Sequence, residues 1–219
     1  MKSDMSKVKK QNILRRILEK FLNRVRQHDG GNREVDRKEN NMDIPNEILF
    51  PLLIEDINKG KTCTLRLRGN SMRPFLESNR DLGIFSSPGE VKVGDPVLAE
   101  IEPGHYVMHR VMKIENGDVT LMGDGNLSCE YCTVSDIRAS VVGFIRNGRH
   151  KADWTDGWKW KTYSWFWVTL RPIRRWLLAF YRYVWLNIFK LKPYKPLKSR
   201  EINEIVKNFE HKKSSSIKK

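Results

Sequence analysis

The stretch Arg-Gly-Asn-Ser-Met-Arg-Pro-Phe-Leu, residues 68–76, decides how this chain folds around its candidate site. It follows residues 62–68, in which apolar and polar side chains alternate as they do in a half-buried strand. A Gly-Asn pair near its start permits a sharp change of direction, and Pro74 fixes the backbone a few residues later. The pattern therefore predicts that Ser71 lies at a strand end, on a bend, with its hydroxyl turned out of the sheet.

A second strand-like run, residues 105–114, carries a candidate partner for that hydroxyl. A serine hydroxyl is a weak nucleophile unless a neighbouring base takes its proton, and His109 supplies an imidazole on this run. His105 lies an even number of residues away, on the same face of the strand, and is the alternative base. Each residue taken alone also fits a structural role, Ser71 as a turn serine and His109 as a partly buried strand histidine.

Four motifs occur in order along the centre of the chain. They are Gly-Asn-Ser-Met-Arg-Pro-Phe-Leu at 69–76, Gly-Asp-Pro-Val at 94–97, His-Arg-Val at 109–111 and Gly-Asp-Gly-Asn at 123–126. In this order and spacing they resemble the superfamily of serine proteases that contains the signal peptidases and the self-cleaving repressors. Bacterial leader peptidases and the repressors use a serine–lysine dyad, whereas the endoplasmic-reticulum and archaeal signal peptidases have histidine in place of the lysine. Because His109 stands there, residues 62–146 resemble the histidine branch.

The resemblance implies hydrolysis of a peptide bond through an acyl-enzyme on Ser71. His109 would take the serine proton as general base and later give it to the leaving amine. The backbone N–H of Ser71 would hold the oxyanion with help from the turn at Asn70, and Met72 would form the lip of the substrate cleft.

The resemblance also implies a carboxylate that orients the histidine. In the histidine-type signal peptidases it follows six residues after the Asp of the Gly-Asp segment, and six residues beyond Asp124 this chain has Glu130. Glutamate is one methylene longer than aspartate but can accept the imidazole N–H. Asp124 is the rival, although its place between two glycines also suits a turn residue. We expect Glu130 to orient the histidine and Asp124 to support the loop.

Strand-like runs separated by short turns predict a mainly β fold. The runs lie at 62–68, 82–86, 96–101, 105–114, 118–122 and 137–146. Short turns between neighbouring strands favour antiparallel pairing, so we expect a coiled antiparallel sheet, the fold that the resemblance also implies. A helix over residues 46–58 should precede the sheet, and helical appendages should lie on both sides of this domain.

The net charge of +15 is concentrated at the two ends of the chain. Residues 1–41 carry 12 basic and 6 acidic side chains, residues 42–144 carry 10 and 15, and residues 145–219 carry 19 and 5. We therefore expect four segments. They are a basic helical arm and linker at 1–41, a signal-peptidase-like catalytic β domain at 42–150, a Trp- and Arg-rich membrane-associating helical segment at 151–195, and a basic tail at 196–219 that is disordered beyond residue 209.

All seven tryptophans lie between residues 154 and 185, interleaved with lysines and arginines. Basic residues and Pro172 interrupt the apolar runs, so neither piece has the ~20 apolar residues of a spanning helix. Because Trp and Tyr favour the headgroup level and arginines bind anionic lipid, we expect residues 154–195 to attach the protein to an anionic membrane surface, peripherally or as a re-entrant segment. The alternatives are a helical hairpin packed on the protease domain and a nucleic-acid surface.

Two functions from different classes fit these features. The first is a membrane-associated serine endopeptidase that cleaves leader or signal segments from exported or modified peptides. The second is a repressor-like regulator of the same fold that self-cleaves or binds DNA, and an inactive scaffold is a weaker third. A histidine instead of a lysine, and no helix-turn-helix pattern at 1–41, favour the endopeptidase and argue against a nucleic-acid partner. Cys129 and Cys132 lack the further ligands of a zinc site, so neither a metal nor another cofactor is expected.

Overall fold

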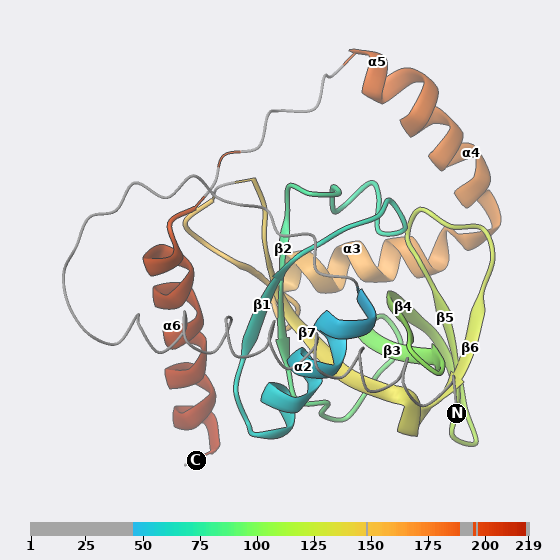
Figure 1. Ribbon diagram of the computed structural model, residues 1–219. Helices are drawn as coiled ribbons and strands as arrows, with labels where there is room; N and C mark the ends of the chain where they lie inside the picture. The colour runs from blue at the N-terminus through green and yellow to red at the C-terminus, as the bar shows by residue number, and fades with distance from the viewer. Residues whose placement is uncertain (1–45, 148, 189–194, 196, 218–219) are drawn as a thin grey trace, which may run out of the picture. The chain divides into compact units, whose positions relative to one another are not determined.

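The structure is a computed structural model that describes residues 46–147, 149–188, 195 and 197–217 (Figure 1). The basic helix expected within residues 1–41 lies outside the described residues and stays a prediction. Contacts join the described residues, from 46 onward, into one unit. The Trp-rich segment therefore belongs to the same folded unit as the strands.

The described residues form an antiparallel sheet in the order β1-β2-β7-β3-β4-β5-β6, with β8 paired to β7 (Figure 1). The strands are β1 (Cys63–Arg66), β2 (Leu82–Ser86), β3 (Pro96–Glu102), β4 (His105–Glu115), β5 (Asp118–Met122), β6 (Glu130–Thr133), β7 (Ile137–Ile145) and β8 (Asp153–Trp154). The predicted mainly β, antiparallel fold is confirmed. Strands β6 and β8 were not among the predicted runs, because runs of four and two residues are too short to show a reliable alternation.

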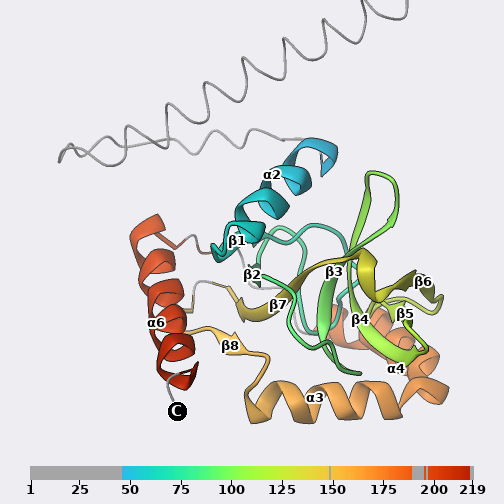
Figure 2. The ribbon, with the colours of Figure 1, turned by 90° about the horizontal axis from the view of Figure 1, so that it is seen from below.

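Apart from the short η1 between β6 and β7, the helices lie before and after the sheet in the chain. They are α2 (Asn46–Asn58), the short η1 (Val134–Asp136), α3 (Trp158–Thr169), η2 (Arg171–Ile173), α4 (Arg174–Phe180), the π-helical η3 (Tyr181–Trp185), α5 (Leu186–Ile188) and α6 (Ser199–Ile217). The predicted helix at 46–58 is confirmed. Figure 2 shows the curved sheet with α2 at one side and α3 at the other.

The main hydrophobic cluster joins both of these helices to the sheet. It contains Leu53 and Ile57 of α2, Phe85, Leu98 and Phe144 of the sheet, Met72 and Leu76 of the segment that carries Ser71, and Trp160 of α3. The Trp160 ring lies 5.0 Å from the Phe144 ring and 4.9 Å from the Phe75 ring, measured between centroids. Helix α3 therefore packs on the domain along one face, as in the hairpin alternative considered above.

Helix α6 corrects the expectation of disorder beyond residue 209. Ile202, Ile205 and Phe209 recur at helical spacing and give the helix one apolar face. Ile205 is buried against Leu82, Ile84 and Ile145, and the Phe209 ring stacks on the Trp154 ring at 4.9 Å. The high Lys and Ser content of the tail concealed this short apolar stripe.

Candidate active site

Ser71 lies on a long turn between β1 and β2. The turn is closed at its base by two backbone hydrogen bonds, from Leu67 N–H to the Asp81 carbonyl at 2.9 Å and from Asn79 N–H to the Leu67 carbonyl at 2.8 Å. Gly69 has φ +93°, a conformation that favours glycine, so the sharp bend predicted there is present. The Asn70 carbonyl accepts the Arg73 N–H at 3.2 Å, which makes a tight turn directly around the serine.

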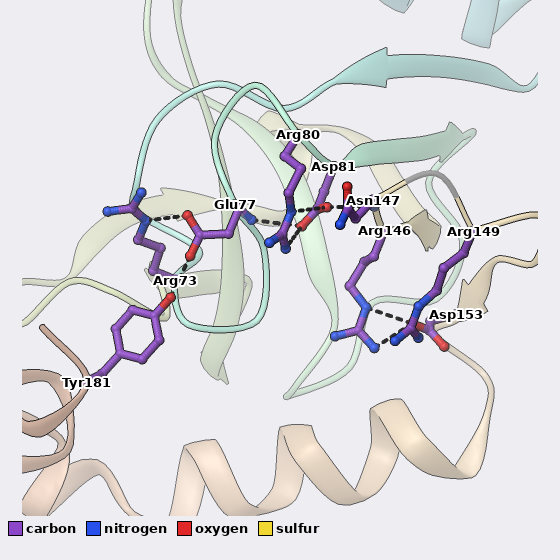
Figure 3. Close-up of polar contacts among 9 residues, drawn as sticks. All are labelled: Arg73, Glu77, Arg80, Asp81, Arg146, Asn147, Arg149, Asp153 and Tyr181. Carbon is purple, nitrogen blue, oxygen red and sulfur yellow. Dashed lines mark hydrogen bonds and ion pairs between the residues drawn. The ribbon is translucent and has the colours of Figure 1, made fainter. Parts of the chain in front are cut away.

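Buried carboxylates hold this turn in place (Figure 3). Glu77 accepts a hydrogen bond from Arg73 Nε at 2.8 Å and another from the Tyr181 hydroxyl at 2.5 Å. Asp81 is fully buried and accepts the Glu77 N–H at 2.8 Å and the Asn147 N–H at 3.0 Å. The serine-bearing turn is thus fixed from both ends.

Met72 is a correction to the sequence analysis. It was expected at the lip of the substrate cleft, but its side chain is buried in the main hydrophobic cluster. Ser71 itself is half-buried. The reversal of direction at the turn puts the thioether into the core, where it anchors the residue next to the candidate nucleophile.

His109 is buried on β4, opposite Val97 of β3, and its ring contacts a carboxylate. Its Nδ1 lies 2.6 Å from Oε2 of Glu130, the first residue of β6. Burial lowers the pKa of His109 below its ordinary value of 6.5, and attraction to the Glu130 carboxylate offsets only part of that effect. The imidazole is therefore mainly neutral at pH 7, the state that a general base needs.

The other ring nitrogen of His109 lies beside the serine-bearing turn. Gly123 separates the two: a Cβ at this glycine would lie 2.5 Å from the Ser71 carbonyl oxygen and 3.0 Å from His109 Nε2. The Gly125 N–H also donates to the Ser71 carbonyl at 2.6 Å. A side chain at 123 would collide with the Ser71 carbonyl oxygen and crowd the imidazole, so glycine allows the serine-bearing turn and the His109 ring to pack against this residue. Among the described residues, no hydrogen bond joins the Ser71 hydroxyl to the imidazole.

Asp124 is engaged elsewhere. Its fully buried carboxylate forms a bidentate pair with Arg110, with Nε to Oδ1 at 2.8 Å and Nη2 to Oδ2 at 2.7 Å, and it accepts the Tyr163 hydroxyl at 3.0 Å. Burial raises the pKa of Tyr163 well above its ordinary value of 10, so the phenol stays a donor. The structure thus brings Glu130, and not Asp124, to the imidazole Nδ1.

His105 occupies the exposed start of β4. Its charge contributes to the lowered pKa of His109, but the contact with Glu130 is made by His109. The geometry therefore favours His109 over His105 as the base.

Helix α3 supplies partners for Arg110 and for the loop at residues 123–126 that could not be predicted from the sequence. Arg110 also donates to the Gly94 carbonyl at 2.8 Å and to Ser164 Oγ at 2.7 Å, and its guanidinium lies 4.5 Å from the Trp160 ring centroid. The Trp167 indole N–H donates to the Asp124 carbonyl at 3.1 Å. Trp160, Ser164 and Trp167 recur at i, i+4 and i+7, a helical stripe that the sequence does contain.

A protein-family model matches the part of the chain that contains the candidate site. Residues 27–145 match the family model described as Peptidase S24-like. No curated protein and no solved structure matches the chain. The matched region covers more than half of the 219 residues. It includes the turn with Ser71, the strand with His109 and the loop at residues 123–126. The chain belongs to the Peptidase S24-like family.

Proposed function

We propose that this protein is a serine endopeptidase in which Ser71 is the nucleophile, His109 the general base and Glu130 the acid that orients the base. The observation that carries the proposal is the arrangement of the imidazole. Its Nδ1 meets Glu130 at 2.6 Å, while its Nε2 lies beside Gly123, which is also in contact with the Ser71 backbone. A carboxylate at Nδ1 and the serine-bearing turn on the side of Nε2 agree with the order of carboxylate, imidazole and hydroxyl in serine hydrolases.

In the proposed reaction His109 Nε2 removes the Ser71 proton as Oγ attacks the scissile carbonyl carbon. The new C–O bond leaves a tetrahedral oxyanion that the Ser71 backbone N–H stabilises, with the turn at Asn70 holding that N–H in place. The C–N bond then breaks, and the imidazolium returns the proton to the leaving amine. Water repeats the sequence on the acyl-enzyme. Glu130 stabilises the imidazolium in both halves, and the Ser71–His109 hydrogen bond forms when substrate binds.

We propose leader or signal segments of exported or modified peptides as the substrates. The full chain is incubated with a peptide library, and new termini are identified by mass spectrometry beside the Ser71→Ala variant. Termini that appear only with the wild type support the endopeptidase. Identical patterns for the two proteins refute it.

Family membership also supports one alternative, a self-cleaving repressor-like regulator. The two differ in what is cut. A regulator of this kind cleaves itself on incubation alone and leaves added peptides uncut. The endopeptidase cleaves added peptides and keeps its own chain intact. The same incubations, followed by intact-mass measurement of the chain, separate them.

The Glu130→Gln variant is expected to lower kcat by roughly 10²–10⁴-fold while leaving the melting temperature unchanged, because the amide keeps the shape but loses the charge that stabilises the imidazolium. Steady-state kinetics and thermal unfolding measure the two effects. The exposed Glu115→Gln on β4 is the matched control. Wild-type turnover in Glu130→Gln would leave a serine–histidine dyad.

The pH dependence of kcat/KM should rise through a midpoint below 6.5. The base works in its neutral form, and burial lowers the pKa of His109, so the rate is retained to lower pH than an exposed histidine would permit. In Glu130→Gln the midpoint should fall further, because the carboxylate raises the pKa of His109. A midpoint near the pKa of lysine, or one that Glu130→Gln does not move, contradicts the assignment of the base.

A further inference from the structure

Helices α3 to α5 expose many large apolar side chains to solvent. On α3, Trp158 and Trp165 are 74% and 63% exposed, opposite the buried Trp160 and Trp167. On α4, Trp176 is 76% exposed, whereas Leu178 is buried. Exposed apolar clusters of this kind mark binding surfaces in soluble domains. We call this surface the aromatic–basic face: Trp158, Trp165, Ile173, Trp176, Tyr183 and Ile188, together with the basic residues between them.

Charge limits what this face binds. From residue 157 to residue 200 the sequence contains no Asp or Glu, and it contains 11 Lys and Arg. Lys159, Lys161, Arg171 and Arg175 are exposed on the described helices. A second copy of the face carries the same positive charge, and residues 1–41, with twice as many basic as acidic side chains, are also repelled. The occupant with complementary charge is therefore anionic.

The apolar side chains favour a lipid surface over a nucleic acid as the anionic partner. Aromatic rings stack on bases, but the exposed aliphatic side chains of Ile173 and Ile188 gain little from bases and much from acyl chains. Among the described residues, no helix is long and apolar enough to cross a membrane. We propose that the aromatic–basic face binds the surface of an anionic lipid bilayer, with helices α3 to α5 lying in the plane of the headgroups.

The inner side of the same helices contacts the candidate active site. Trp167 donates to the Asp124 carbonyl, and Arg182 of η3 donates to the Gly125 carbonyl at 3.3 Å. Residues 123–126 in turn contact Ser71 and His109. Bilayer binding therefore holds the site close to the headgroups, which favours peptides whose cleavage sites lie next to the membrane. This consequence rests on the proposed peptidase function, whereas the binding itself does not.

Vesicle binding tests the proposal with an intrinsic probe. All seven tryptophans lie in residues 154–185, so the tryptophan emission of the full chain reports on this segment alone. We expect the chain to float with phosphatidylglycerol–phosphatidylcholine vesicles, and its emission to shift to the blue and to be quenched by lipids brominated near the headgroup. The chain should bind pure phosphatidylcholine vesicles more weakly. Salt at about 0.5 M should weaken its binding to the anionic vesicles, because salt screens the attraction between exposed charges.

Substitutions of apolar and basic residues on the aromatic–basic face, with one control outside it, make the test more specific. Replacing Trp165, Trp176 and Tyr183 together by Ala should lower vesicle affinity by roughly tenfold or more. All three side chains are exposed in the free protein and would be buried against lipid only when the bilayer is bound. Lys159→Gln and Lys161→Gln should each lower it by roughly fivefold. Tyr131→Ala, an equally exposed aromatic residue on β6, is the matched control and should bind as the wild type does.

Failure to float with any vesicle overturns the proposal, as does equal binding by the triple variant. Two other results also overturn it: binding of an RNA or DNA oligonucleotide that excludes vesicles, or a dimer in sedimentation that the triple variant abolishes. If the chain binds vesicles as expected but leaves the peptide library uncut, the peptidase proposal fails, whereas the proposal of lipid binding is supported.

Discussion

Ser71→Ala is expected to reduce peptide cleavage by at least about 10³-fold, with an unchanged melting temperature. The side chain of Ser71 is half-buried on a turn that backbone hydrogen bonds and buried carboxylates hold closed, so its hydroxyl adds little to stability. His109→Ala should be as damaging, because the Ser71 hydroxyl is a weak nucleophile without the base that takes its proton. Cleavage rates are measured with the peptide that the library assay identifies, and stability is measured by thermal unfolding.

The double variant gives the stronger result. When two groups act as one unit, removing both costs about as much as removing either. Ser71→Ala combined with His109→Ala should therefore retain the rate of the single variants. Losses that multiply would indicate two independent contributions and would contradict the shared role. His105→Ala is the control, since its side chain is exposed at the start of the same strand, and it should keep most of the wild-type rate.

Asp124→Asn is expected to destabilise the fold by about 3–5 kcal/mol, because it leaves the fully buried Arg110 without its counter-charge. For a folded unit of this size the loss corresponds to a fall in melting temperature of roughly 6–20 °C. Glu115→Gln removes an exposed partner of Lys113 and should change the melting temperature little.

The comparison with Glu130→Gln separates the two carboxylates. Asp124→Asn should cleave peptide well below its own melting temperature, whereas Glu130→Gln should be stable and slow. The reverse pattern would transfer the orienting role to Asp124. If Asp124→Asn does not fold, its failure agrees with the structural role, and Ser164→Ala, which removes only one partner of Arg110, should give a milder loss of stability in the same direction.

The sequence predicted the parts of the site that depend on local spacing. The bend at Gly69, the strand with His109 and the step of six residues from Asp124 to Glu130 can each be read along the chain, and the structure brings Glu130 to the imidazole. The role of Arg110 could not be read this way. Its partners come from residues 94, 124 and 164, and no local pattern joins positions that far apart.

Two further differences have physical reasons. Met72 was expected in the cleft because it follows the serine, but a turn reverses side-chain direction within one residue and sends the thioether into the core. Helix α6 was missed because its net composition is basic and polar, while only one narrow stripe around Ile205 is buried. Composition averages over both faces of a helix, whereas packing depends on one face.

The nucleophilic role of Ser71 is tested most directly by trapping its acyl-enzyme. The full chain is mixed with the peptide that it cleaves, quenched with acid during turnover, and measured by intact-protein mass spectrometry followed by peptide mapping. We predict an adduct with the mass of the acyl fragment on the peptide that contains Ser71, and no adduct in Ser71→Ala. Turnover without any adduct at Ser71, together with wild-type cleavage by Ser71→Ala, would contradict the proposed mechanism.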